Sequence, residues 1–184
     1  MSAKTAATSF IAAALAVVPE RATADPLLDL SVVRSIEQTA QGTRISFDVD
    51  RPAVEDYVRT AAMSDLQKYP GVKIDKITLG GAPGTSVLDV TADFTVVHRL
   101  GIGMLRASGT IVAHVALSTG GGNMVEGQLL LDSISLGGEP LPLNGLTVGA
   151  GRRQVDLSGV DGAIQRITIE SIDASWIAVS IDVH

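Results

Sequence analysis

Residues 85–136 read TSVLDVTADFTVVHRLGIGMLRASGTIVAHVALSTGGGNMVEGQLLLDSISL. Apolar and polar residues alternate along most of this stretch, which is the period-two pattern of a strand with one buried face. In its first part the polar positions are Asp89, Thr91, Asp93 and Thr95, with apolar residues between them. The stretch therefore predicts three long antiparallel strands joined by tight turns.

The same alternation predicts how these strands pair. A turn at residues 100–103 places residue 99 opposite residue 104, and this register brings apolar pairs to one face: 96 with 107, 94 with 109, 92 with 111, 90 with 113 and 88 with 115. A second turn at residues 119–123, with residue 117 opposite 125, adds Val125, Gly127, Leu129 and Leu131 to that face. A slip of one residue would turn the whole apolar set outward, so the register is strongly specified.

One amphipathic helix precedes this meander. Asp50-Arg51-Pro52 predicts its start, because a carboxylate caps a helix well and proline suits the first turn. The helix carries one apolar stripe and ends at Pro70-Gly71; the stripe consists of Val54, Tyr57, Val58, Ala61, Ala62 and Leu66. The opposite face has mixed charges, which favours packing on a sheet over lying on a membrane surface.

Further strands are predicted at residues 28–38 and 44–49 as a hairpin, and at 72–80, 164–172 and 176–183, with short edge strands at 146–148 and 154–157. Residues 137–145 read as a loop, because their prolines do not suit a central strand. The whole pattern predicts an α+β fold. It would consist of a long, curled antiparallel β-meander packed on one main amphipathic helix, or of a partly open barrel.

The composition limits the classes of function. The chain has 184 residues, no cysteine and a net charge of −6, which disfavours disulfides, thiolate sites and a nucleic-acid-binding role. Hydrophobic residues make up 46% and charged residues 18%. This much apolar surface must be buried, lie in a membrane or face a ligand.

The first 24 residues have the order of a secretory signal peptide. Lys4 precedes an apolar run at Ala6–Val18, and Ala22-Thr23-Ala24 forms an A-x-A cleavage site. This predicts cleavage after Ala24, a single domain at residues 25–184 and a periplasmic or secreted location. Two alternatives remain: a retained anchor that makes a membrane or assembly contact through residues 1–18, and an Ala-rich helix packed on the domain.

The predicted sheet suggests a ligand site. The strand at residues 105–117 is far longer than the typical strand of about 5–6 residues. Small residues gather on its apolar face, which indicates close approach of either the helix or a ligand. We expect an apolar groove for a lipid or similar molecule, lined by Leu88, Val90, Phe94, Ala107, Gly109, Ile111, Ala113, Val115, Leu129 and Leu131, with Tyr57 and Val58 from the helix.

The order of motifs resembles a known family. The helix is followed by Val72–Leu79, the long meander, Gly137-Gly138-Glu139-Pro140-Leu141-Pro142 and the closing segments Ile167–Ile172 and Trp176–Val183. This order resembles secreted bacterial domains of the tubular lipid-binding (TULIP-like) superfamily. Those domains continue into a second long helix, whereas residues 144–163 here are rich in glycine and show no helical stripe. The resemblance implies binding of an acyl chain or a polyprenyl-type lipid in an envelope compartment.

The sequence shows no catalytic or metal-binding constellation. His114 is expected opposite Asp89, but one histidine and one carboxylate fall short of a metal site. Ser158 lacks a G-x-S-x-G elbow, and the glycine runs do not match nucleotide-binding spacings. We therefore expect no cofactor, no metal and no enzyme activity. The predicted function is an exported lipid carrier of the bacterial envelope; the alternative is a structural or accessory subunit of a larger membrane-associated assembly.

Overall fold

A computed structural model of the chain describes residues 31–66, 71–100, 103–122, 124–143, 152–156 and 162–184. The predicted leader, the predicted strand at 146–148 and Ser158 lie outside these residues. The elements in chain order are β1 (Ser31–Thr39), β2 (Gly42–Asp50), α3 (Arg51–Leu66), β3 (Val72–Gly80), β4 (Val87–Leu100), β5 (Gly103–Gly121), β6 (Met124–Leu136), β7 (Glu139–Pro140), β8 (Arg152–Asp156), β9 (Ile164–Ile172) and β10 (Trp176–Val183).

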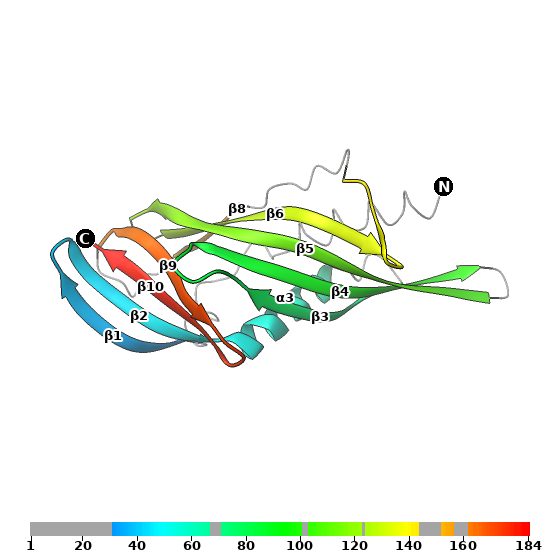
Figure 1. Cartoon of the computed structure of the whole chain (residues 1–184), viewed down its shortest axis with the longest axis horizontal. Helices are drawn as coiled ribbons and strands as arrows, with labels where there is room; N and C mark the ends of the chain where they lie inside the picture. The colour runs from blue at the N-terminus through cyan, green and yellow to red at the C-terminus, as the bar shows by residue number, and fades with distance from the viewer. Residues whose placement is uncertain (1–30, 67–70, 101–102, 123, 144–151, 157–161) are drawn as a thin grey trace.

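The described strands form two open antiparallel sheets. One sheet has the order β1-β2-β10-β9; the other has the order β3-β4-β5-β6-β7, with β8 also paired to β6. Figure 1 shows an elongated molecule with the four-stranded sheet at one end and the β4–β5 hairpin projecting at the other. Neither sheet of the described chain closes into a barrel. The fold of the described residues is therefore mainly β. The α+β prediction overestimated the part of the fold formed by the 16-residue helix α3.

The β4–β5 register is confirmed at every predicted pair, from Leu88 opposite Val115 to Arg99 opposite Met104. The β5–β6 register differs from the prediction by two residues, because Leu117 lies opposite Gly127 instead of residue 125. A shift of two keeps every side chain on its predicted face. A bulge near Asp132 then changes the parity, so Ile134 lies opposite Ile111 and joins the core.

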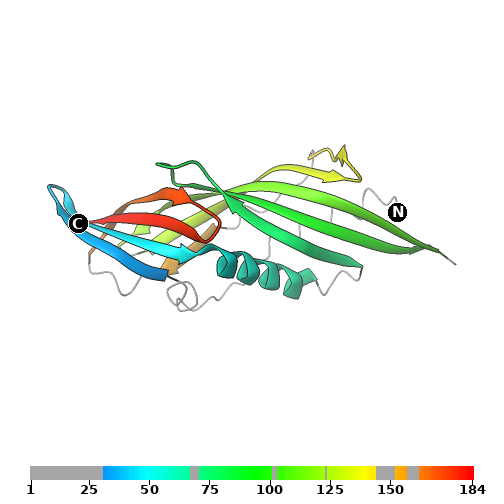
Figure 2. The same cartoon turned by 60° about the horizontal axis from the view of Figure 1, so that its bottom comes forward.

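Helix α3 begins where the sequence predicts. The Asp50 carboxylate accepts a hydrogen bond of 2.8 Å from the Ala53 N–H, as an N-cap does. The helix lies along β3, beneath the six-stranded sheet in Figure 2. Two N–H groups of β3 donate to helix side chains: Leu79 to Glu55 Oε1 at 2.8 Å and Ile74 to Met63 Sδ at 3.2 Å. The helix thus covers the outer edge of β3.

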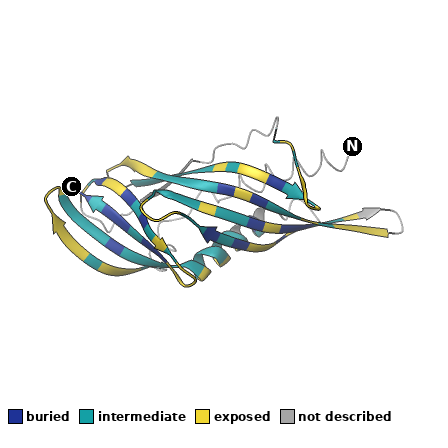
Figure 3. Cartoon of the chain, in the orientation of Figure 1, coloured by how far each residue is buried: buried dark blue, intermediate teal, exposed yellow. Residues whose placement is uncertain are grey.

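One hydrophobic core joins the two sheets. It includes Phe94, Ile111 and Ile134 from the six-stranded sheet and Ile169 and Ile177 from the four-stranded sheet. Backbone bonds join the sheets as well, since the Ile169 N–H donates to Thr85 O at 2.7 Å and the Gly84 N–H donates to Ile169 O at 2.8 Å. Figure 3 shows buried residues alternating with more exposed ones along the strands, as the period-two pattern requires.

Candidate functional site

Part of the predicted groove is packed core. Phe94 is 2% exposed, Ile111 3% and Ala113 1%, and Val58 of the helix packs against the same core. These side chains fill the interior between the sheets and the helix. A role for them in ligand contact stays a prediction, and ligand contact there would require the core to open.

An aromatic ring explains one of the small inward residues. Phe94 lies opposite Gly109 in the register. A Cβ atom at Gly109 would lie 2.4 Å from Phe94 Cζ and 2.3 Å from the carbonyl oxygen of Ser135, so the ring occupies the space that a side chain would need. The sequence analysis predicted close approach of either the helix or a ligand at this glycine, and the structure shows instead that a side chain of the neighbouring strand lies there. The sequence contained the information needed for this explanation, because the predicted register already paired Phe94 with Gly109.

Five other predicted residues lie together and remain partly exposed: Leu88, Val90, Val115, Leu129 and Leu131. Three of them, Leu88, Val90 and Leu131, also pack against the core. They form two rows across β4, β5 and β6. In one row Val115 lies between Leu88 and Leu129; in the other Ala113 lies between Val90 and Leu131. We call these five residues the apolar platform. The two-residue shift in β6 changed their neighbours but left all five on the predicted face.

The main contacts of the helix are not with the platform strands β4, β5 and β6. In the described chain α3 makes its main contacts with β3 and smaller ones with β2 and β10. Tyr57 is half-buried, and Val58 belongs to the core side of the helix. Ala107, the remaining predicted residue, is half-buried near the projecting end of β5. The structure thus places Ala107 away from the platform, whereas Val58 packs against the same core as Leu88, Val90 and Leu131.

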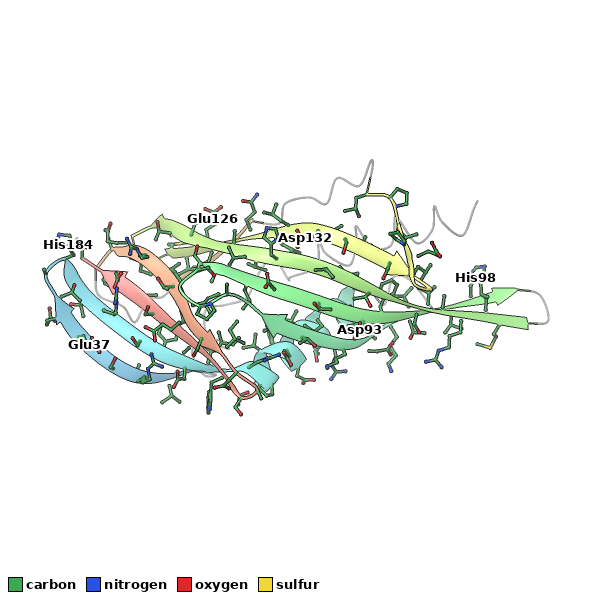
Figure 4. The ribbon with its side chains drawn as sticks, in the orientation of Figure 1. Glu37, Asp93, His98, Glu126, Asp132 and His184 are labelled. Atoms are coloured by element: carbon green, nitrogen blue, oxygen red, sulfur yellow. The ribbon has the colours of Figure 1, made fainter. Side chains whose placement is uncertain are left out.

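The opposite face of the six-stranded sheet is polar. His114 lies opposite Asp89 as predicted, but its Nδ1 is 2.9 Å from Asp132 Oδ1 on β6, which Figure 4 labels. The Asp132 contact was missed because it depends on the β6 bulge. On the same face the Thr95 hydroxyl donates to Asp75 at 2.6 Å, and this bond lowers the pKa of Asp75. Across the described residues there is no cluster of three potential metal ligands.

A polar pocket of about 580 Å³ lies where residues 84–86 cross β9, and sequence reasoning missed it. Its lining includes Arg44, Thr85, Arg166, Glu170 and Ser180. Arg44 donates to Asp182 at 2.7 and 3.1 Å, and Arg34 pairs with Glu170. The lining comes from three distant parts of the chain, so no local pattern could reveal it. Its ion-paired, hydroxyl-bearing surface does not suit an apolar ligand.

No protein-family model, no curated protein and no solved structure matches the chain. The resemblance to tubular lipid-binding domains therefore stays an expectation from the sequence. No helix in the described ranges has both the length and the hydropathy to cross a bilayer.

Proposed function

We propose that the protein binds a lipid or another apolar molecule on the apolar platform, without catalysis. One observation supports this most: the five apolar platform residues of three adjacent strands stay partly exposed beside the core, against which Leu88, Val90 and Leu131 also pack, while the same sheet face farther along the strands is buried. Apolar side chains gathered on one surface favour contact with an apolar partner over contact with water.

The dimensions of the platform suit a hydrocarbon chain. Three adjacent strands span about 10 Å, given an inter-strand spacing of roughly 4.8 Å. An extended acyl chain is narrower than this and could lie along or across the rows. Each buried methylene group contributes about 0.8 kcal/mol, so several must be covered to offset the cost of ordering the ligand. This favours a long-chain lipid over a small apolar molecule.

The location is part of the proposal and rests on the first 24 residues. Their signal-peptide pattern supports export and cleavage after Ala24, which would place a carrier in the bacterial periplasm or outside the cell. A carrier there would shield an acyl chain from water between membranes. The experiment is native mass spectrometry of the protein purified from its export pathway, with the bound material extracted and the amino terminus read.

Matched substitutions on the two faces of the sheet locate the ligand. Leu129→Gln and Val115→Thr alter the platform, while Leu130→Gln and Val112→Thr make the same changes on the other face, where both residues are exposed. We expect the platform variants to lower retained lipid several-fold, because each loses about 1 kcal/mol of apolar contact. The outer-face variants should retain it. A lipid-free protein, or equal effects on both faces, would refute the proposal.

A second function, as a subunit of a larger assembly, is favoured by strand β1. Val32, Val33 and Ile36 are all exposed on this edge strand, Ile36 at 65%. Exposed apolar residues on a sheet edge are suited to pairing with another chain. Under this alternative the purified protein would be lipid-free and would run as an oligomer or with a partner, and Ile36→Lys would dissociate it.

A further inference from the structure

The β4–β5 hairpin extends beyond both of its neighbouring strands. Pairing of β3 with β4 ends at Val96, and pairing of β6 with β5 begins at Gly109. The last lateral backbone bonds are from the Val97 N–H to Gly71 O at 2.6 Å and from the Gly137 N–H to Ser108 O at 2.8 Å. Residues 98–100 and 103–107 therefore form a ribbon of only two strands in the described structure, which we call the tip ribbon. It projects from one end of the molecule (Figure 1).

The tip ribbon exposes large apolar side chains. Met104 is 73% exposed and Leu105 is 52% exposed. Because they are consecutive residues of a strand, they point to opposite faces of the ribbon. Folding the ribbon back against the body would cover one of them and leave the other in water. A flat protein surface could cover only one of these two side chains. An apolar environment that encloses the ribbon on both faces would cover both.

The charge of the tip ribbon is opposite to that of the chain. Its sequence contains His98, Arg99 and Arg106 and no acidic residue, whereas the whole chain has a net charge of −6. Figure 4 places His98 at this projecting end. The tip ribbon is thus a cationic, apolar end on an acidic protein. That combination complements a surface with negative charge outside and hydrocarbon beneath.

We infer that the tip ribbon docks on an anionic lipid bilayer. Met104 and Leu105 enter the boundary between headgroups and acyl chains, and Arg106 remains at the level of the lipid phosphates. The acidic body of the protein is repelled by the same surface, so the molecule meets the membrane end-on. This inference uses residues distant from the apolar platform and does not depend on the proposed carrier function.

The test measures binding of the full chain to two kinds of vesicle, phosphatidylcholine alone and phosphatidylcholine mixed with phosphatidylglycerol, by flotation. We expect binding to the anionic vesicles only, reduced at least about tenfold by the double variant Met104→Asp with Leu105→Asp. Arg106→Glu should weaken binding and its salt dependence. The matched control is Val33→Asp with Ile36→Asp, two exposed apolar residues on β1, which should bind like the wild type.

A labelling experiment covers the case in which an aspartate variant fails to fold. The chain has no cysteine, so Met104→Cys or Ile36→Cys provides one unique site for an environment-sensitive fluorophore. Anionic vesicles should shift the emission of the label at residue 104 to the blue and leave the label at residue 36 unchanged. Equal binding to both vesicle types, no binding to either, or equal shifts at both positions would overturn the inference. Met104→Asp should keep lipid uptake on the platform, which separates this test from that of the carrier function.

Discussion

At the scale of single residues, the contact between Phe94 and Gly109 determines how β4 and β5 pack. The Phe94 ring fills the space that a side chain at position 109 would need. A smaller residue at 94 would therefore leave a cavity, and a larger residue at 109 would clash with the ring. This packing also explains why the sequence alone does not show which group lies against a small residue on the apolar face of a strand. Small residues indicate that another group lies close to the strand, and that group can be a side chain of the neighbouring strand, as Phe94 is here.

Gly109→Ala tests this packing. Its Cβ would lie 2.3 Å from a backbone oxygen and 2.4 Å from the Phe94 ring, so we expect the free energy of unfolding to fall by about 1–3 kcal/mol. Gly127→Ala is the matched control on β6, because its Cβ would meet Val115 at 3.4 Å and Leu117 at 3.8 Å, in ordinary contact. Urea unfolding measures both. Equal stabilities for the two variants would contradict the packing argument.

The Arg44–Asp182 pair predicts a pH dependence. The two residues lie opposite each other on β2 and β10, and the hydrogen bonds from Arg44 hold the pKa of Asp182 below its ordinary value of 3.8. A carboxylate with a lowered folded-state pKa stabilises the fold fully above pH 3.8, and this stabilisation is lost as the pH falls through the folded-state pKa. Asp182→Asn should therefore destabilise the protein at pH 7 and lose that effect in strong acid. A stability difference that is the same at both pH values would refute this.

At the scale of elements, alternation and capping predicted most of the strands and the helix. The β3, β9 and β10 bounds were predicted to the residue, because turn residues flank each strand, although register shifts interrupt the alternation in β3 and β9. The β6 bulge was not predictable, since Leu129, Leu130 and Leu131 are all apolar and hide the change of parity. The division into two sheets was also missed, because it depends on pairing between β2 and β10, which are distant in the sequence.

The attachment of α3 to β3 depends on Glu55. Its Oε1 accepts from the Leu79 N–H at 2.8 Å and from Arg51 Nε at 2.9 Å. Glu55→Ala leaves the amide of the buried Leu79 without this acceptor, and we expect a loss of about 1–3 kcal/mol in unfolding free energy. Glu55→Gln keeps a carbonyl oxygen in place and should lose less. Hydrogen exchange of the Leu79 amide measures this hydrogen bond directly and should be faster in Glu55→Ala than in Glu55→Gln. Equal exchange rates in the two variants would contradict a role for the bond.

At the scale of the whole molecule, residues of both sheets contribute to one core. Ile169 of β9 is 1% exposed within a core that includes Phe94 and Ile134 of the other sheet. Of the candidate site, the sequence predicted which residues share the apolar face. The sequence could not predict which of these residues are fully buried, because their burial depends on where the second sheet and the helix lie.

Ile169→Ala tests the coupling between the sheets. The cavity should cost about 2–5 kcal/mol, and amide exchange should accelerate in β4 and β5 as well as in β9 and β10. A single unfolding transition seen alike by circular dichroism and by the fluorescence of Trp176 would agree with one cooperative unit. Separate transitions, or faster exchange confined to β9 and β10, would show that the sheets unfold independently.

The position of β10 between β2 and β9 has a consequence for synthesis of the chain. The β3–β6 meander pairs neighbours in sequence and can form while later residues are still being made. The four-stranded sheet cannot, because β10, one of its two inner strands, is translated after the other three strands. Until residues 176–183 leave the ribosome, the apolar side chains of β2 and β9 face water or a chaperone. A pause in translation after β9 would therefore leave the four-stranded sheet incomplete, with exposed apolar side chains that favour aggregation of the nascent chain.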